Sequence, residues 1–262
     1  MRFLSRVNKG IRWRISNARE RLRRFAFPKR IRDAWGQIRA ENISYTTDPQ
    51  LYQLLAQVRK TSNTNALIIE AGCARGGSAI LMCAAKATER PMHVYDMFDM
   101  IPPPSEKDGA DMKARYQEIA SGSATGIGGS QYYLYEDDLK AVVESNFVRY
   151  GYPTTSNSVT LIKGDISETL VVSEPIALAH IDVDWYKPVS TALERIVPHL
   201  ILGGAVVLHA YFDWSGCRKA TDEYFDRIGR DGFEFDSSAG HLMVTRSASY
   251  SPRARIVAVD TD

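Results

Sequence analysis

Short apolar segments alternate with helical ones over most of the chain, and this alternation limits the fold more than any other feature. Five segments rich in Val, Ile, Leu and Ala are predicted as buried strands, at residues 66–72, 92–98, 158–165, 176–184 and 204–211. Helical patterns occupy residues 51–60, 77–87, 132–151, 188–199 and 218–229. Strands that alternate with helices form a parallel sheet with helices on both faces. We therefore expect an α/β fold with a Rossmann-like, doubly wound, mostly parallel sheet.

Composition limits the class of protein. A chain of 262 residues with 44% hydrophobic residues can bury a full core as one domain with appendages. The sequence shows no apolar stretch long enough to span a bilayer and no signal core, so secretion is not expected. Its three cysteines, Cys73, Cys83 and Cys217, are too few and too scattered for a disulfide framework. We expect reduced thiols in a cytoplasmic protein.

Charge is distributed unevenly along the chain. Residues 1–40 hold 13 Lys/Arg and 2 acidic residues, whereas residues 41–262 hold 20 basic and 29 acidic ones. Apolar residues recur at helical spacing in the basic part until Pro28. We therefore divide the chain into a basic amphipathic helical arm, residues 1–40, and a body, residues 41–262.

Two interpretations of the arm stay open. Through residues 1–27 it can lie on an anionic membrane, which would place the protein peripherally on the inner face. The same apolar stripe can instead pack on the body or on a second subunit, and a homo-oligomer is expected. Nucleic acid is not an expected partner, because the body carries no basic, aromatic-interleaved patch.

The first predicted strand runs into a glycine-rich turn. Gly72 permits a tight turn, and Gly76 and Gly77 permit close backbone approach where a helix begins. The spacing is neither G-x-G-x-x-G nor that of a P-loop. Asp96, at the end of the second strand, can accept hydrogen bonds from both hydroxyls of a ribose or can cap a turn. Together with the acidic Glu70 before the first glycine, the pattern favours S-adenosylmethionine over NAD. The predicted cofactor-binding residues are Glu70, Gly72, Arg75, Gly76, Gly77, Ser78 and Asp96.

Two carboxylates follow the fourth predicted strand, in the motif His180-Ile-Asp182-Val-Asp184. Alternation places Asp182 and Asp184 on one face. A hard cation such as Mg²⁺ would offset the cost of burying them. The alternative is that Asp184 caps the next helix while Asp182 accepts backbone N–H groups.

These blocks resemble the macrocin-type class I S-adenosylmethionine-dependent O-methyltransferases of macrolide and aminocoumarin antibiotic biosynthesis. The resemblance runs from about residue 45 to residue 230 and rests on EAGCARGGS, YDMFDMIPPP, ESNFVRYGY, HIDVDWYKPVSTALERIVPHLILGG and KATDEYF. It implies S-adenosylmethionine at Glu70–Ser78 and Asp96. It also implies Mg²⁺ held by an Asp at the position of Asp182 and by two consecutive aspartates at positions 209 and 210.

The chain departs from that metal pattern, because His209 and Ala210 stand where the family has the Asp pair. Three interpretations stay open. In the first, His209 acts as a metal-free base with Asp182 orienting it. In the second, Asp182 and His209 hold a softer divalent ion, such as Mn²⁺ or Zn²⁺, more weakly than the family holds its metal. In the third, Ala210 replaces a natural aspartate.

The predicted activity is methyl transfer to a sugar hydroxyl of a glycan or glycosylated natural product, with Asp182 and His209 as catalytic residues. The basic arm suggests a lipid-linked acceptor. Tyr45, Thr46 and the polar loop 101–130 are candidates for a lid, and His241 is a reserve base at the end of an edge strand. The competing hypothesis is a catalytically degenerate methyltransferase fold that binds S-adenosylmethionine or scaffolds a partner.

Overall fold

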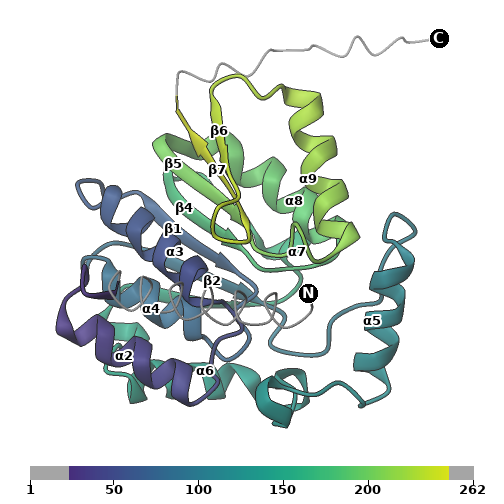
Figure 1. The fold of residues 1–262 in the computed structure, drawn as a ribbon, viewed down its shortest axis with the longest axis horizontal. Helices are drawn as coiled ribbons and strands as arrows, with labels where there is room; N and C mark the ends of the chain where they lie inside the picture. Colours follow the sequence, from purple (N-terminus) through teal and green to yellow (C-terminus); the bar gives the residue numbers. More distant parts are fainter. Residues whose placement is uncertain (1–23, 248–262) are drawn as a thin grey trace, which may run out of the picture.

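The computed structural model describes residues 24–247, which form a seven-stranded sheet flanked by helices on both faces (Figure 1). The strand order is β3-β2-β1-β4-β5-β7-β6, with β1 to β5 parallel and with β7 antiparallel to both β5 and β6. The strands are β1 (Leu67–Ala71), β2 (Met92–Asp96), β3 (Val159–Lys163), β4 (Ile176–Ile181), β5 (Leu200–Leu208), β6 (Phe233–Asp236) and β7 (Leu242–Arg246). The predicted doubly wound, mostly parallel α/β fold is confirmed.

Helices before and between the strands form the two outer layers. They are α2 (Lys29–Ala40), α3 (Asp48–Lys60), α4 (Gly77–Ala85), α5 (Ala110–Ala120), α6 (Leu139–Arg149), α7 (Ile166–Thr169), α8 (Tyr186–Ile196) and α9 (Ser215–Ile228). Short 3₁₀ turns occupy η1 (Ile127–Gly129), η2 (Tyr133–Tyr135), η3 (Thr154–Ser156) and η4 (Val197–His199).

The sheet separates two apolar cores. Side chains of α2, α3, α4 and α6 form one core with one sheet face, and α8 and α9 form the other core with the opposite face. Strands β1 and β4 are buried along their whole length, as expected for central parallel strands covered on both sides. Packing on both faces of the sheet therefore holds the carboxyl ends of β1, β2, β4 and β5 in fixed positions next to one another.

Part of the predicted arm belongs to the body. Helix α2 follows Pro28 and buries Ile31, Trp35 and Ile38 in the same core as α3 and α4. Phe27 is also buried there and contacts the Trp35 ring. Residues 27–40 are thus packed against the body. The predicted membrane-binding segment lies mostly outside the described residues, because the description begins at residue 24.

Several predicted boundaries shift. The strand predicted over residues 176–184 ends at Ile181, so Asp182 and Asp184 follow it in a loop. The helix predicted over residues 132–151 begins only at Leu139, because the Asp138 carboxylate accepts from the N–H of Ala141 at 3.0 Å and caps it there. His241 was expected on an edge strand. It precedes β7 instead, which lies between β5 and the true edge strand β6.

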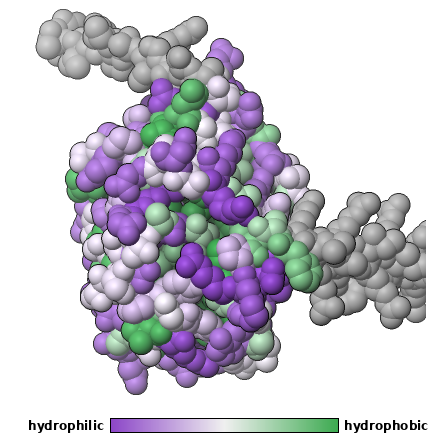
Figure 2. Space-filling view, turned by 90° about the vertical axis from the view of Figure 1, so that its left-hand side faces the viewer, coloured by the Kyte–Doolittle hydropathy of each residue, from purple (hydrophilic) through white to green (hydrophobic). Residues whose placement is uncertain are grey.

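Within residues 24–247, no helix has both the length and the apolar character needed to cross a bilayer. Figure 2 shows one side of the molecule as mainly hydrophilic, with hydrophobic residues in separate small patches. All three cysteines are buried and unpaired.

Candidate functional site

A cavity of about 210 Å³ opens where β1, β2 and β4 end. Gly72, Asp96, Asp182 and Asp184 line its inner side. In open α/β sheets, ligands bind outside the carboxyl ends of the strands, near the point where the strand order reverses. That reversal lies between β1 and β4 in this sheet. The cavity is therefore the candidate binding site.

Gly72 brings the ends of β1 and β4 together. Its φ of 85° lies in the left-handed region, and its N–H donates to the carbonyl of Tyr95 at 2.8 Å. A Cβ at this position would collide with the backbone carbonyl of Asp182. The residue can therefore hardly be anything but glycine, and its missing side chain leaves room at the inner wall of the cavity.

Asp96 organises the same turn from the end of β2. Its carboxylate accepts from the N–H of Cys73 at 2.8 Å and from the N–H of Phe98 at 2.9 Å. Burial raises the pKa of Asp96, and the hydrogen bonds from these backbone groups oppose the rise. The predicted turn-capping role is thus present. A carboxylate oxygen can accept more than one hydrogen bond, so these backbone contacts do not by themselves exclude a ligand hydroxyl.

The other predicted cofactor residues lie around the turn rather than in the cavity wall. Glu70 is fully buried and accepts a hydrogen bond from Ser78, which lies in α4. Arg75 forms an ion pair with Glu136 at 2.6 Å. Gly76, with φ of 87°, precedes α4, and Gly77 packs tightly against residues 43–44. These residues shape the glycine turn, and their cofactor contacts stay a prediction.

The loop predicted as a lid builds the outer wall. Ile101, Pro102 and Pro103 line the cavity. The carbonyl of Pro102 accepts from the Trp185 indole at 2.9 Å, and buried Asp108 accepts from the N–H of Tyr186 at 2.7 Å. The loop is therefore anchored to the start of α8.

Aromatic rings complete this wall. Tyr132 and Tyr133 of the η2 region line the cavity, with ring centroids 4.6 Å apart. Tyr45, another predicted lid residue, is 40% exposed and contacts the Tyr133 ring at its edge. Thr46 is buried. Tilted tyrosine rings next to a carboxylate at the end of β2 suit a nucleoside, whose base is flat and whose ribose carries hydroxyls.

The two carboxylates after β4 both face the cavity. The N–H of Asp182 donates to the carbonyl of Ala71 at 2.7 Å, which fixes it beside the glycine turn. Burial and the nearby Asp182 raise the pKa of Asp184 to about 7. Asp184 therefore changes protonation near neutral pH.

His209 and Ala210 point into different surroundings. The His209 Nδ1 atom lies 3.9 Å from Asp182 Oδ2 and 3.2 Å from His180 Nε2. Burial lowers the pKa of His209, so the imidazole is neutral at neutral pH. Ala210 is 2% exposed and belongs to the apolar core under α8 and α9. Of the three metal positions that the family resemblance implies, only Asp182 offers an oxygen ligand.

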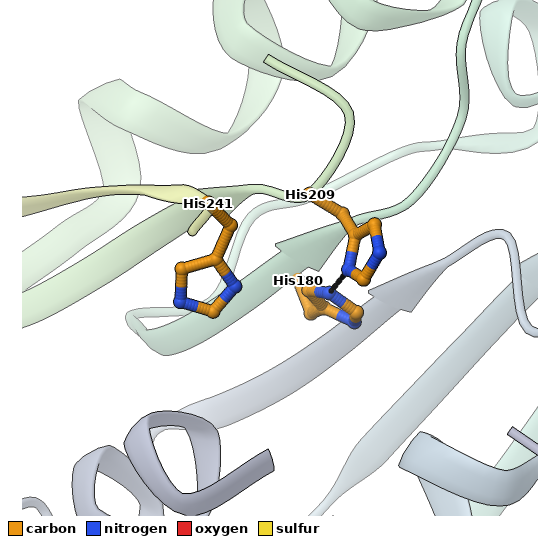
Figure 3. Close-up of side chains that lie close together, drawn as sticks. All are labelled: His180, His209 and His241. Atoms are coloured by element: carbon orange, nitrogen blue, oxygen red, sulfur yellow. Dashed lines mark hydrogen bonds between the residues drawn. The ribbon is translucent and has the colours of Figure 1, made fainter. Parts of the chain in front are cut away.

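Three histidines, from β4, the end of β5 and the segment before β7, converge on one another (Figure 3). His180 and His241 are fully buried, and His209 is the ring that comes within 3.9 Å of Asp182 Oδ2. Burial lowers the pKa of His241 to about 3. The potential ligand atoms of the three rings all lie within 4.8 Å of one another.

His180 was not predicted as a site residue, although it stands two positions before Asp182. Tyr132 and Tyr133, predicted as part of a regular helix, were not predicted as site residues either. The same holds for the end of β3, where Gly164 and Asp165 line the cavity. The cluster YYLY directly after the polar loop was the available signal for the aromatic wall.

Comparisons with known proteins agree with this geometry. The model of the Macrocin-O-methyltransferase (TylF) family matches residues 46–231. A relative from Streptomyces olivaceus, 8-demethyl-8-(2,3-dimethoxy-alpha-L-rhamnosyl)-tetracenomycin-C 4'-O-methyltransferase, is 30% identical over 168 residues. That match covers 62% of this chain and only 59% of the relative.

Two solved structures share the fold. The O-methyltransferase NovP has a TM-score of 0.63 and 22% identity, and the match covers 77% of this chain and 80% of NovP. The calicheamicin methyltransferase CalS11 has a TM-score of 0.52 and 19% identity over 75% of this chain and 77% of its own.

Proposed function

The chain belongs to the macrocin O-methyltransferase family, and we propose that it transfers a methyl group from S-adenosylmethionine to a hydroxyl of a sugar-containing acceptor. The observation that carries the proposal is the cavity at the carboxyl ends of β1, β2 and β4, lined by Gly72, Asp96, Asp182 and Asp184. The relative named for a rhamnosyl-tetracenomycin supports a sugar as the acceptor.

The residues of the cavity fit the cofactor. When bound, S-adenosylmethionine supplies a methyl group already activated on a sulfonium. Gly72 leaves space for close approach to the backbone, and Asp96 offers two carboxylate oxygens for ribose hydroxyls. The Tyr132 and Tyr133 rings shield this end from water. The chain then has to orient the acceptor and remove its proton.

We assign proton removal to the carboxylates after β4. Asp184 lines the cavity and is the proposed proton acceptor, and Asp182 holds the acceptor hydroxyl beside it. His209 is not among the residues that line the cavity, so it acts through Asp182, whose Oδ2 lies 3.9 Å from its Nδ1. Of the predicted catalytic pair, Asp182 thus faces the acceptor, and His209 positions Asp182.

No step through Mg²⁺ is proposed. Mg²⁺ prefers an octahedron of oxygen ligands. At the three positions implied by the family, this chain offers one carboxylate, one imidazole and one methyl group buried in an apolar core. The family's magnesium site does not fit these residues.

The second candidate is the catalytically degenerate fold, and the loss of the family's Asp pair is the observation that favours it. A turnover assay decides between this candidate and the active enzyme. The purified chain is incubated with S-adenosylmethionine and a panel of sugar-bearing natural products and sugar nucleotides, and S-adenosylhomocysteine is measured. We expect turnover with at least one acceptor. Tight binding of S-adenosylmethionine without turnover on any of them would support the degenerate fold, and absence of binding would contradict both.

The Asp184→Asn variant tests the proposed proton acceptor. It should lower kcat by about 10²–10⁴-fold, the range of general base catalysis, while the affinity for S-adenosylhomocysteine stays within about threefold. The exposed Asp137→Asn variant is the matched control and should keep its turnover. Unchanged kcat in Asp184→Asn would contradict the assignment.

The membrane contact of the arm is proposed separately. Residues 1–23 carry eight of the chain's basic residues and Glu20 as the sole acid. Each basic residue near an anionic surface contributes roughly 1 kcal/mol. Deleting residues 1–23 leaves α2 in place and should abolish pelleting with anionic liposomes, and unchanged pelleting would contradict the contact. A lipid-linked acceptor and a peripheral cytoplasmic location depend on this result.

A further inference from the structure

The strand register brings three histidines to one face of the sheet. His180 pairs with Val207 in β5, and Val207 pairs with Met243 in β7. Side chains alternate along strands, so His209 and His241, two positions away from Val207 and Met243, point to the same face. The three rings come from different segments of the chain and meet at one point (Figure 3). Such convergence in a buried layer calls for a physical reason.

Two of the rings have their outer nitrogen fixed by an acceptor. The Gln53 amide donates through Nε2 to Asp236 at 2.6 Å, so its Oε1 faces His241 Nε2 at 2.6 Å and accepts from it. His180 Nδ1 lies 3.2 Å from Glu70 Oε2, and the other oxygen of Glu70 accepts from Ser78. Both rings therefore donate outwards, and their lone pairs lie on His241 Nδ1 and His180 Nε2.

The two inner nitrogens differ: His180 Nε2 is hydrogen-bonded to His209 Nδ1, whereas His241 Nδ1 has no partner among the described residues. His241 is fully buried, and its Nδ1 has no hydrogen-bond partner. Burying such an acceptor without a partner costs about 1–3 kcal/mol. His180 Nε2 faces His209 Nδ1 at 3.2 Å, a separation close to the roughly 3.3 Å between two ligands of a tetrahedral zinc ion.

We propose that His180, His209 and His241 bind a transition metal ion of the zinc type. Imidazole ligands suit Zn²⁺, Co²⁺ or Ni²⁺ and do not suit Mg²⁺. Ligating histidines commonly donate their other N–H to a carboxylate or carbonyl oxygen, as His180 does to Glu70 and His241 does to Gln53. On binding, the proton on His209 Nδ1 moves to Nε2 of the same ring, so the imidazole stays neutral and both Nδ1 and His180 Nε2 can ligate the ion.

The proposed ion lies beside the cavity but outside its lining. Asp182 connects the two, because it lines the cavity and its Oδ2 lies 3.9 Å from His209 Nδ1. The inference does not depend on methyl transfer, because it rests on the three rings and their outer partners alone. Metal binding can hold where methyl transfer fails, and the reverse is also true.

Metal titration tests the site. The full chain, prepared without a polyhistidine tag and treated with a chelator, is titrated with Zn²⁺ by calorimetry and with Co²⁺ by visible absorption. We expect one ion per chain, a Co²⁺ spectrum of tetrahedral or five-coordinate type, and no competition from excess Mg²⁺. No stoichiometric Zn²⁺ binding would overturn the proposal.

Substitutions locate the ion. His209→Gln and His241→Gln should each weaken Zn²⁺ binding by more than about 100-fold, beyond the 10–100-fold effect of an outer partner. His199→Gln, outside the cluster in η4, is the matched control and should bind as tightly as the unaltered chain. Equal affinity in all three variants would place the ion elsewhere and contradict the proposal.

Gln53 provides a variant that spares the cluster itself. Gln53→Ala removes the acceptor of His241 Nε2 from the partly exposed side of α3 and should weaken Zn²⁺ binding by about 10–100-fold. Gln53→Glu keeps an acceptor and should restore most of the affinity. These two variants decide the question even if a substitution in the buried cluster prevents folding, and unaltered binding in Gln53→Ala would count against the site.

Discussion

The carboxyl ends of β1 and β2 are shaped mainly by backbone, whereas the ends of β4 and β5, with the start of β7, are shaped by titratable side chains. At the first region, Gly72 turns the chain and Asp96 holds two backbone N–H groups. At the second, Asp182 and Asp184 stand in front of three histidines. The first region tolerates little change, because backbone geometry admits few residues. In the second region, one titratable side chain can be substituted for another without a change in the path of the strands.

The largest predicted effect on stability comes from a substitution at the contact between the two regions. Gly72→Ala would place a Cβ 2.8 Å from the carbonyl carbon of Asp182 and would hold alanine at a φ of 85°. Overpacking and left-handed strain together should lower the free energy of unfolding by about 3–5 kcal/mol. Urea denaturation measures the loss.

Gly122→Ala is the matched control for backbone strain alone. Gly122 has a φ of 77°, but a Cβ there would meet nothing within 4 Å. Its cost should be about 1–2 kcal/mol. Equal losses in the two variants would show that the β1 turn does not press on the end of β4.

The next effect probes whether the second region can regain the family's oxygen ligands. Ala210→Asp would put a carboxylate into the apolar core that contains Leu208 and Cys217. We expect a loss of about 2–4 kcal/mol and no Mg²⁺-dependent stabilisation, because the side chain faces away from the cavity. Urea denaturation with and without Mg²⁺ measures both quantities.

The exposed Ala141→Asp variant is the control and should change stability by no more than about 0.5 kcal/mol. An increase in the stability of Ala210→Asp on addition of Mg²⁺ would mean that position 210 can face the cavity. It would support the interpretation that Ala210 replaces a metal-binding aspartate.

The same contrast explains what could be predicted from the sequence. The alternation of apolar and helical segments predicted the parallel sheet. Gly72, Asp96 and Asp182 could be predicted as site residues because a glycine turn or an acidic residue directly after a strand is visible in the local sequence. The histidine cluster leaves no such local signal. His180, His209 and His241 are far apart in the chain, and only the register of β4, β5 and β7 brings them together. The sequence does not reveal register or the antiparallel insertion of β7, since both depend on packing across the whole sheet.

Tertiary contacts add what local patterns leave open. The sequence leaves position 210 without a metal ligand, and the structure adds that the chain turns after His209, where the carbonyl of Ala210 accepts from the N–H groups of Asp213 and Trp214. Residues 29–40 were assigned to the arm by charge. Their apolar face, with Trp35 and Ile38, packs into the core. The charge of a segment reports on the exposed face of its helix and does not reveal whether the opposite face packs into the core.

Asp96→Asn tests the first region through ligand binding. The amide keeps one acceptor oxygen but replaces the other with a donor, which faces the N–H of Cys73 or of Phe98. A lost hydrogen bond to a charged group is worth about 1.5–3 kcal/mol, so the affinity for S-adenosylhomocysteine should fall about 10–100-fold. Calorimetry measures the affinity. The exposed Asp99→Asn variant, three residues after Asp96, should bind normally, and equal affinities in both variants would contradict the ribose role.

The smallest effect concerns the outer wall that both regions share. Asp111 of α5 accepts from the N–H of Ser215 at 2.9 Å and from its hydroxyl, which ties the wall to α9. Slight burial opposes the charged form, but the bonds from Ser215 prevail and lower the pKa of Asp111.

A lowered pKa in the folded state means that the stabilisation by Asp111 is present above the pKa of the unfolded state and is lost as the pH falls through the pKa of the folded state. Asp111→Asn should therefore cost about 0.5–1 kcal/mol at pH 6, a modest amount because the group is exposed, and less at pH 3. Urea denaturation at the two pH values, with exposed Asp33→Asn as the control, measures the difference, and a loss that does not change with pH would show that the carboxylate charge does not hold the wall.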